Sequence, residues 1–178
     1  MNWDLYWNKT KSTPLERLIQ KAKSRWGYKK LLESVKLGVP GRSLEIGCGE
    51  ARLSQILRTK GWHTTGLDIL SFNPQIDEFV IGDIFQLPFG NKVFDICISC
   101  GLLEHFEGSS VQAILEEQHR VAKRVINWLP VKSGWWTAFQ SIRKIMGADM
   151  PPCSYSHKKL HTGVVSFFGV LNYVYCDE

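Results

Sequence analysis

Glycines and carboxylates gather in one short stretch, LEIGCGEARLS, at residues 44–54. Gly47 and Gly49 have no Cβ and tolerate positive φ, so a turn built from them lets a ligand approach the backbone closely. Glu45 and Glu50 flank this turn. A loop that binds pyrophosphate is not expected to hold two carboxylates at its rim without a compensating cation. The stretch therefore favours a ligand that carries positive charge, although a G-x-G pattern alone also fits a tight turn that binds nothing.

Two aspartates repeat the pattern further along the chain, each at the end of an apolar run. Asp68 lies 19 residues beyond Gly49, where a carboxylate can accept both hydroxyls of a ribose. In IGDIFQLPF, the Asp83 carboxylate suits the amino group of adenine and the Ile84 amide suits a ring nitrogen. An aspartate at a strand end is also a common turn residue, but three such signals in succession predict a nucleoside site. S-adenosylmethionine fits this site, because it joins adenosine to a cationic sulfonium and an ammonium group.

Short apolar runs alternate with helical patterns from Arg42 onward. The apolar runs are SLEI, HTTGL, EFVI, FDICIS and VAKRVIN, and the helical patterns include RLSQILRTK and VQAILEEQHR. This order predicts an α/β fold with a doubly wound, mostly parallel sheet, whose strands are joined by right-handed helical crossovers. Ligands of such sheets bind beyond the carboxyl ends of the strands. We therefore expect the chemistry after Ile46, Leu67, Ile81 and Ser99.

Four motifs between about Leu44 and Phe106 carry a family resemblance. In order and spacing, LEIGCGEARLS, GLDIL, GDIFQLPF and FDICISCGLLEHF resemble the cofactor-binding motifs of class I S-adenosylmethionine-dependent methyltransferases, especially the small-molecule branch known as type 11. The resemblance implies a Rossmann-like fold that binds S-adenosylmethionine and releases S-adenosylhomocysteine. It implies cofactor contacts from Glu45, Ile46, Gly47, Cys48 and Gly49 around the methionine portion, Asp68 and Ile69 at the ribose, Asp83 and Ile84 at the adenine, and Ser99, Cys100 and Gly101 near the sulfonium.

The chemistry of methyl transfer asks little of the protein beyond alignment. The reaction is an in-line displacement, so nucleophile, methyl carbon and sulfur must be held in a row and water excluded. A base helps when the acceptor is a hydroxyl, and His105 in GLLEHF is the candidate catalytic residue. The same histidine could instead cap the pocket or brace the following helix.

The acceptor is expected to be a small molecule of unknown identity. The segment SCGLLEHF has no Asn or Asp followed by two prolines and an aromatic residue, the arrangement that clamps a flipped base. Two alternatives stay open. One is a catalytically silent cofactor-binding module. The other is an NAD(P)-dependent oxidoreductase, which is disfavoured because the third glycine of the dinucleotide fingerprint is replaced by Arg52.

The 178 residues are expected to form a single domain. Residues 1–40 are interpreted as an N-terminal helical lid, 41–130 as the cofactor-binding core, and 131–178 as a substrate-side insertion followed by a C-terminal strand region. Two features depart from the family pattern: the proline-glycine-glycine turn before the fifth strand is missing, as is the sequence of a full strand hairpin after Gly169. We therefore expect six strands with the last one or two abbreviated, Val170 to Tyr175 forming the sixth.

The net charge of +5 arises entirely from residues 1–36, which carry nine Lys or Arg against three acidic residues. Such a segment could bind RNA, but a solvated helix face is the simpler interpretation, so we expect no nucleic-acid partner. No apolar run is long enough to span a membrane. The five cysteines form no disulfide framework, which favours the cytoplasm. Cys97 and Cys100 form an isolated C-x-x-C, for which we expect two buried thiols and no metal.

Overall fold

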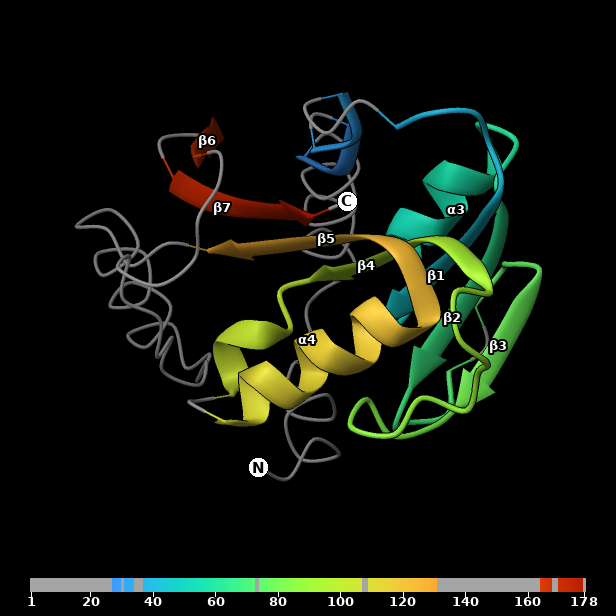
Figure 1. The fold of residues 1–178 in the computed structure, drawn as a ribbon. Coiled ribbons are helices and arrows are strands. Elements are labelled where there is room, and N and C mark those ends of the chain that lie inside the picture. The colour runs from blue at the N-terminus through green and yellow to red at the C-terminus, as the bar shows by residue number, and fades with distance from the viewer. Residues whose placement is uncertain are drawn as a thin grey trace.

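The computed structural model describes residues 27–29, 31–33, 37–72, 74–106, 109–130, 164–167 and 170–177. Its centre is a seven-stranded sheet with the order β3-β2-β1-β4-β5-β7-β6 (Figure 1). The strands are β1 (Arg42–Ile46), β2 (His63–Asp68), β3 (Glu78–Ile81), β4 (Phe94–Cys100), β5 (Ala122–Pro130), β6 (Val164–Phe167) and β7 (Val170–Asp177). Strands β1 to β5 run parallel to one another, whereas β7 pairs antiparallel with β5. The strand order reverses direction between β1 and β4. The doubly wound, mostly parallel sheet predicted from the sequence is confirmed.

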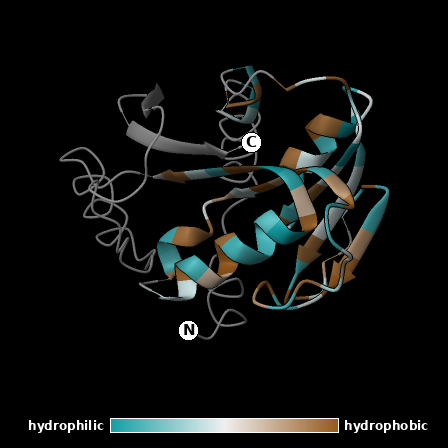
Figure 2. Cartoon of the chain, in the orientation of Figure 1, coloured by the Kyte–Doolittle hydropathy of each residue, from teal (hydrophilic) through white to brown (hydrophobic). Residues whose placement is uncertain are grey.

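Helices α3 (Arg52–Arg58) and α4 (Ser109–Val121) cover opposite faces of this sheet (Figure 1). Because side chains alternate along a strand, β4 contributes to both faces: Cys97 belongs to the apolar cluster under α4, whereas Ile96 and Ile98 belong to the cluster under α3. Figure 2 shows hydrophobic and hydrophilic residues mixed along α4. The helix buries Val111, Ile114, Gln118 and Val121, the spacing expected of an amphipathic helix.

The strand count differs from the sequence expectation. The sheet has seven strands, because Val164–Phe167 forms a short strand β6 that pairs antiparallel with β7, with Phe167 opposite Val170. Six strands were expected because no hairpin sequence follows Gly169, whereas β6, the first strand of the observed pair, precedes this residue in the sequence. The expected abbreviation applies to β6, which is four residues long.

Most of the expected N-terminal lid lies outside the described residues, as do the expected helix from Trp135 to Met146 and the rest of the substrate-side insertion. Within residues 1–40, positions 27–29 and 31–33 are helical. Leu31 and Leu32 are buried in the cluster under α3. The division into lid, core and insertion stays a prediction. In the part of the chain that is described, no helix combines the length and the apolar character needed to cross a membrane.

Candidate cofactor site and active site

The turn between β1 and α3 adopts a backbone that requires small residues. Gly47, Gly49 and Ala51 all have positive φ, at 61°, 51° and 51°. A Cβ added to Gly47 would lie 2.7 Å from Leu102 Cδ1, so this glycine is needed for both conformation and space. The Cys48 amide donates to the Leu67 carbonyl at 3.1 Å, which fastens the turn to the end of β2.

Glu45 is buried rather than placed at a rim. Glu45 is the second-last residue of β1 and is 4% exposed. Its Oε2 accepts the Ser54 amide of α3 at 2.8 Å. Helix α3 has no side-chain cap of its own, so strand β1 supplies the carboxylate that its first amides need. Burial raises the pKa of Glu45 to about 7, against the opposing effect of the Ser54 hydrogen bond.

Glu50 has a cationic partner. Its carboxylate forms an ion pair with Arg52 at 2.7 Å; the Glu50 side chain is exposed and that of Arg52 is partly buried. The expectation of two uncompensated carboxylates at the rim of the turn is therefore wrong, because one is buried under a helix and the other is neutralised two residues away. The charge argument against a phosphate ligand does not hold at Glu50.

Asp68 lies where three strand ends meet. The side chain is 9% exposed; Oδ2 accepts the Gly49 amide at 2.9 Å and Oδ1 accepts the Leu70 amide at 3.1 Å. Its backbone carbonyl accepts the Gly82 amide at 3.0 Å, just beyond β3. Since each carboxylate oxygen has two lone pairs, both oxygens retain accepting capacity after these bonds. The side chain is thus held in one orientation and can still accept two hydroxyls.

Asp83 and Ile84 follow β3. The exposed Asp83 carboxylate accepts the Phe85 amide at 2.9 Å, and the Asp83 carbonyl accepts the Gln86 amide at 3.2 Å, so the aspartate closes its own turn. Ile84 packs partly against the core.

Sequence reasoning missed the apolar side chains around this turn. Ile81 and Phe85 are 60% and 41% exposed, and Ile69, which was predicted, is 58% exposed. Phe85 also makes an edge-to-face contact with Phe106, with ring centroids 5.5 Å apart. Large apolar groups exposed together at a strand edge suit a flat aromatic ligand. The available signal was an isoleucine in the last position of an edge strand, directly before the Gly-Asp pair.

The residues at the end of β4 divide between the two faces of the sheet. The Ser99 hydroxyl is fully buried on the α4 face and donates to the Asn127 side chain, so Ser99 can meet a ligand only through its backbone. Cys100 points to the other face, where burial raises the pKa of its thiol well above the usual value. Cys97 and Cys100 therefore cannot share a metal ion. Among the described residues no cluster of three or more His, Cys, Asp or Glu side chains could hold one.

A short 3₁₀ turn, Leu103–His105, follows Gly101, which has a φ of 68°. His105 is half-buried; burial lowers the pKa of its imidazole, while a hydrogen bond with the Gly101 backbone acts in the opposite direction. The lowered pKa favours the neutral imidazole, which is the form that can accept a proton. Glu104 is buried beside it, and burial raises the pKa of its carboxyl to about 7.

The fold brings the predicted residues to one edge of the sheet. The turns after β1, β2, β3 and β4 leave the same carboxyl edge, and hydrogen bonds link the first three through Cys48, Gly49 and Asp68. This is the crevice beside the reversal of strand order where doubly wound sheets bind ligands. Residues 44–125 also match the model of a protein family described as a methyltransferase domain. Over these residues, which make up a little under half of the chain, the protein is similar to a methyltransferase domain.

Individual proteins are also similar to this chain. A malonyl-[acyl-carrier protein] O-methyltransferase from Erwinia pyrifoliae is 35% identical over 101 residues, which cover 53% of this chain and 38% of that enzyme. The match thus spans less than half the length of this curated relative. The magnesium protoporphyrin IX methyltransferase of Synechocystis PCC 6803, solved with bound S-adenosylhomocysteine, aligns over 98% of this chain and 91% of its own, with a TM-score of 0.63 and 19% identity. A 1,6-didemethyltoxoflavin-N1-methyltransferase from Burkholderia thailandensis aligns over 66% and 56%, with a TM-score of 0.54 and 19% identity. The structural likenesses show the fold.

Proposed function

We propose that this chain binds S-adenosylmethionine at the carboxyl edge of its sheet and transfers the methyl group to a small-molecule acceptor. The observation that carries the proposal is the Asp68 carboxylate. It is nearly buried, held by two backbone amides from different turns, and still able to accept two further hydrogen bonds. A ribose diol presents two hydroxyl donors on adjacent carbons, which one carboxylate can accept.

The remaining contacts follow from the position of this carboxylate. In the proposal, residues Glu45, Ile46, Gly47, Cys48 and Gly49 surround the methionine portion, and Ile69 lies beside the ribose. Asp83 and the Ile84 amide recognise the adenine, and Ser99, Cys100 and Gly101 border the sulfonium through their backbone. The match to a methyltransferase domain supports this arrangement, because it includes all of these residues.

For the acceptor, the proposal is limited to a small molecule. The names of the relatives include an O-methyltransferase and an N1-methyltransferase, so they agree on methyl transfer and differ in the atom that is methylated. If the acceptor here is a hydroxyl, the neutral His105 takes its proton while the methyl group moves in line from sulfur to oxygen. We also place the protein in the cytoplasm, a proposal supported by the free thiols of Cys48, Cys97 and Cys100.

The test is calorimetric titration with S-adenosylmethionine and S-adenosylhomocysteine. We expect micromolar dissociation constants, about −8 kcal/mol, weakened at least tenfold by Asp68→Ala. Asp95→Ala is the matched control, because Asp95 lies at the start of β4, where it accepts the Arg42 amide at 2.8 Å, on the opposite edge of the sheet. Preference for NADH over S-adenosylhomocysteine, or equal effects of the two substitutions, would refute the proposal.

A further inference from the structure

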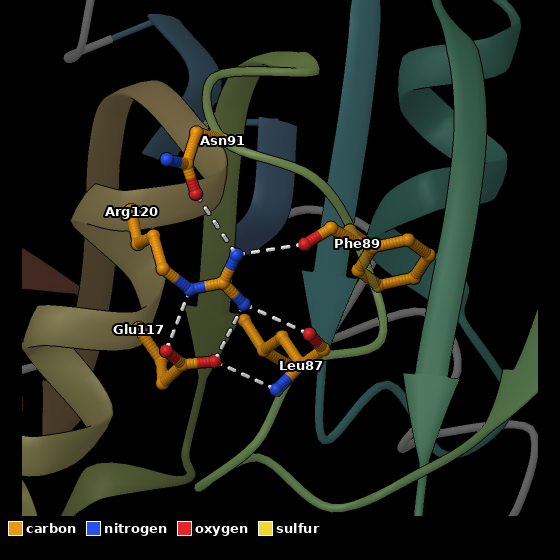
Figure 3. Close-up of polar contacts among 5 residues, drawn as sticks. All are labelled: Leu87, Phe89, Asn91, Glu117 and Arg120. Atoms are coloured by element: carbon orange, nitrogen blue, oxygen red, sulfur yellow. Dashed lines mark hydrogen bonds and ion pairs between the residues drawn. The ribbon is translucent and has the colours of Figure 1, made fainter.

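The connection between β3 and β4, residues 82–93, is anchored by two side chains of α4. Figure 3 shows Glu117 and Arg120 reaching from the helix to this connection. The Glu117 carboxylate accepts the Leu87 amide at 2.7 Å, and Arg120 donates to the Leu87 carbonyl at 2.8 Å. Both polar groups of one backbone residue are thus held from one helix. We call Glu117 and Arg120 the α4 clasp.

Arg120 uses every donor that it has. Nε and one Nη2 hydrogen go to the two oxygens of Glu117, at 2.7 and 2.8 Å, and the other Nη2 hydrogen goes to Leu87. Nη1 donates to the Phe89 carbonyl at 2.7 Å and to the Asn91 side chain at 3.2 Å. A guanidinium has five N–H groups in a fixed plane, and all five are engaged. Lysine, with a compact ammonium and three donors, cannot reproduce this set.

The same connection begins with the Asp83 turn. The Gln86 amide donates to the Asp83 carbonyl, and Leu87 is the next residue along the chain. Leu87 is also 3% exposed, so its side chain fixes the segment in the core while the clasp fixes its backbone. At the far end, the Lys92 amide donates to the Arg120 carbonyl at 2.8 Å. The Asp83 turn is therefore followed, four residues later, by a backbone position that α4 holds in place.

We propose that Glu117 and Arg120 are positioning residues that set the geometry of the adenine subsite, an inference that rests on the proposed function. They touch no ligand. They hold Leu87 so that the Asp83 carboxylate and the Ile84 amide are in place before the base arrives. A preorganised polar pair rejects a base whose hydrogen-bonding pattern does not match, because its groups cannot shift to find other partners. Without the clasp, the turn adapts and selectivity falls.

The preference for one ligand over another distinguishes a positioning role of Arg120 from a general effect on stability. S-inosylhomocysteine carries a carbonyl where S-adenosylhomocysteine carries the 6-amino group, so it cannot donate to Asp83. We expect native protein to bind S-adenosylhomocysteine at least about tenfold more tightly than this analogue. In Arg120→Lys, the ratio of the two dissociation constants should fall at least threefold. Arg58→Lys is the control, since Arg58 on α3 pairs with Asp77 at 3.1 Å, away from this segment, and it should leave the ratio unchanged.

Two further measurements keep the test decisive if Arg120→Lys folds poorly. Asn91→Ala removes only the longest of the five contacts of Arg120, and it should lower the ratio by a smaller factor than Arg120→Lys. Hydrogen exchange should show faster exchange of the Leu87 amide in Glu117→Ala than in native protein. An unchanged ratio in folded Arg120→Lys and Asn91→Ala, or native protein that does not discriminate between the ligands, would overturn the inference. Native protein that binds neither ligand would instead overturn the proposed function.

Discussion

Replacing Glu45 by glutamine should make the protein's stability less dependent on pH. The carboxyl group is 4% exposed, and burial raises its pKa from 4.5 to about 7. A raised folded-state pKa means that the native state holds its proton more tightly than the unfolded state does. Stability from this group is therefore fully present below pH 4.5 and is lost as pH rises toward 7.

The magnitude follows from the shift. Each pKa unit corresponds to about 1.4 kcal/mol. Most of the resulting loss of stability occurs between pH 5 and pH 8. Over that interval Glu45 should lower the free energy of unfolding by about 2–3 kcal/mol. Glutamine is nearly isosteric with the protonated acid and can still accept the Ser54 amide, so the two proteins should be close in stability at pH 5. At pH 8, Glu45→Gln should be the more stable by about 2–3 kcal/mol.

Urea unfolding at pH 5 and pH 8, in the absence of cofactor, measures this difference directly. Glu104 titrates in the same range, with a pKa raised to about 7 by burial, but it is present in both proteins and cancels in the comparison. Glu116→Gln, on the exposed face of α4, is the matched control. It should leave the difference in the free energy of unfolding between pH 5 and pH 8 unchanged. A stability difference between native protein and Glu45→Gln that is the same at both pH values would show that Glu45 is not buried as an acid, and the reasoning would fail.

Three further outcomes are expected. Gly47→Ala should destabilise the protein by about 1–3 kcal/mol in thermal unfolding, because its φ is 61° and an added Cβ meets a side chain, whereas Gly38→Ala, with nothing within 4 Å of the new Cβ, should not. Asn127→Ala should cost about 2–4 kcal/mol in urea unfolding, since it breaks a reciprocal pair of side-chain hydrogen bonds with Gln118, each 3.0 Å long, in a fully buried site; Asn127→Leu combined with Gln118→Leu should cost less than the sum of the single changes. Affinity for S-adenosylhomocysteine should tighten as pH rises from 5.5 to 7, by up to about tenfold per unit, if its ammonium group binds ionised Glu45, and calorimetry on Glu45→Gln should show a flatter dependence.

The strands, and the sheet edge where the candidate site lies, were accessible from the sequence because the signals are local. Apolar runs of four to seven residues predicted the carboxyl ends of β1 and β3 at Ile46 and Ile81, where the structure has them. Strands β2 and β4 end one residue later than expected. In a parallel sheet these ends must share an edge, so the order of the elements alone predicted that the turns would meet. The hairpin of β6 and β7 was missed because β6 is too short for its alternation to be distinguished from a loop.

The contacts that stabilise the site were not accessible, because they join residues distant in the sequence. Nothing near Glu117 indicates that its partner is the Leu87 amide, 30 residues earlier. The buried pair of Gln118 and Asn127 poses the same difficulty: each looks like an ordinary polar residue of a helix or a strand until the packing of α4 on β5 brings the two together.

Glu45 has a structural role that the sequence argument did not predict. The sequence assigned its charge to a ligand at an open rim, whereas the structure uses one carboxylate oxygen to accept an amide of α3 and buries the group. The two roles are compatible, because an ionised carboxylate can bind a helix amide with one oxygen and an ammonium group with the other. They are also coupled: a cationic ligand that favours the ionised form lowers the pKa of Glu45 and strengthens its bond to the helix. Binding at this turn should therefore make α3 more resistant to unfolding.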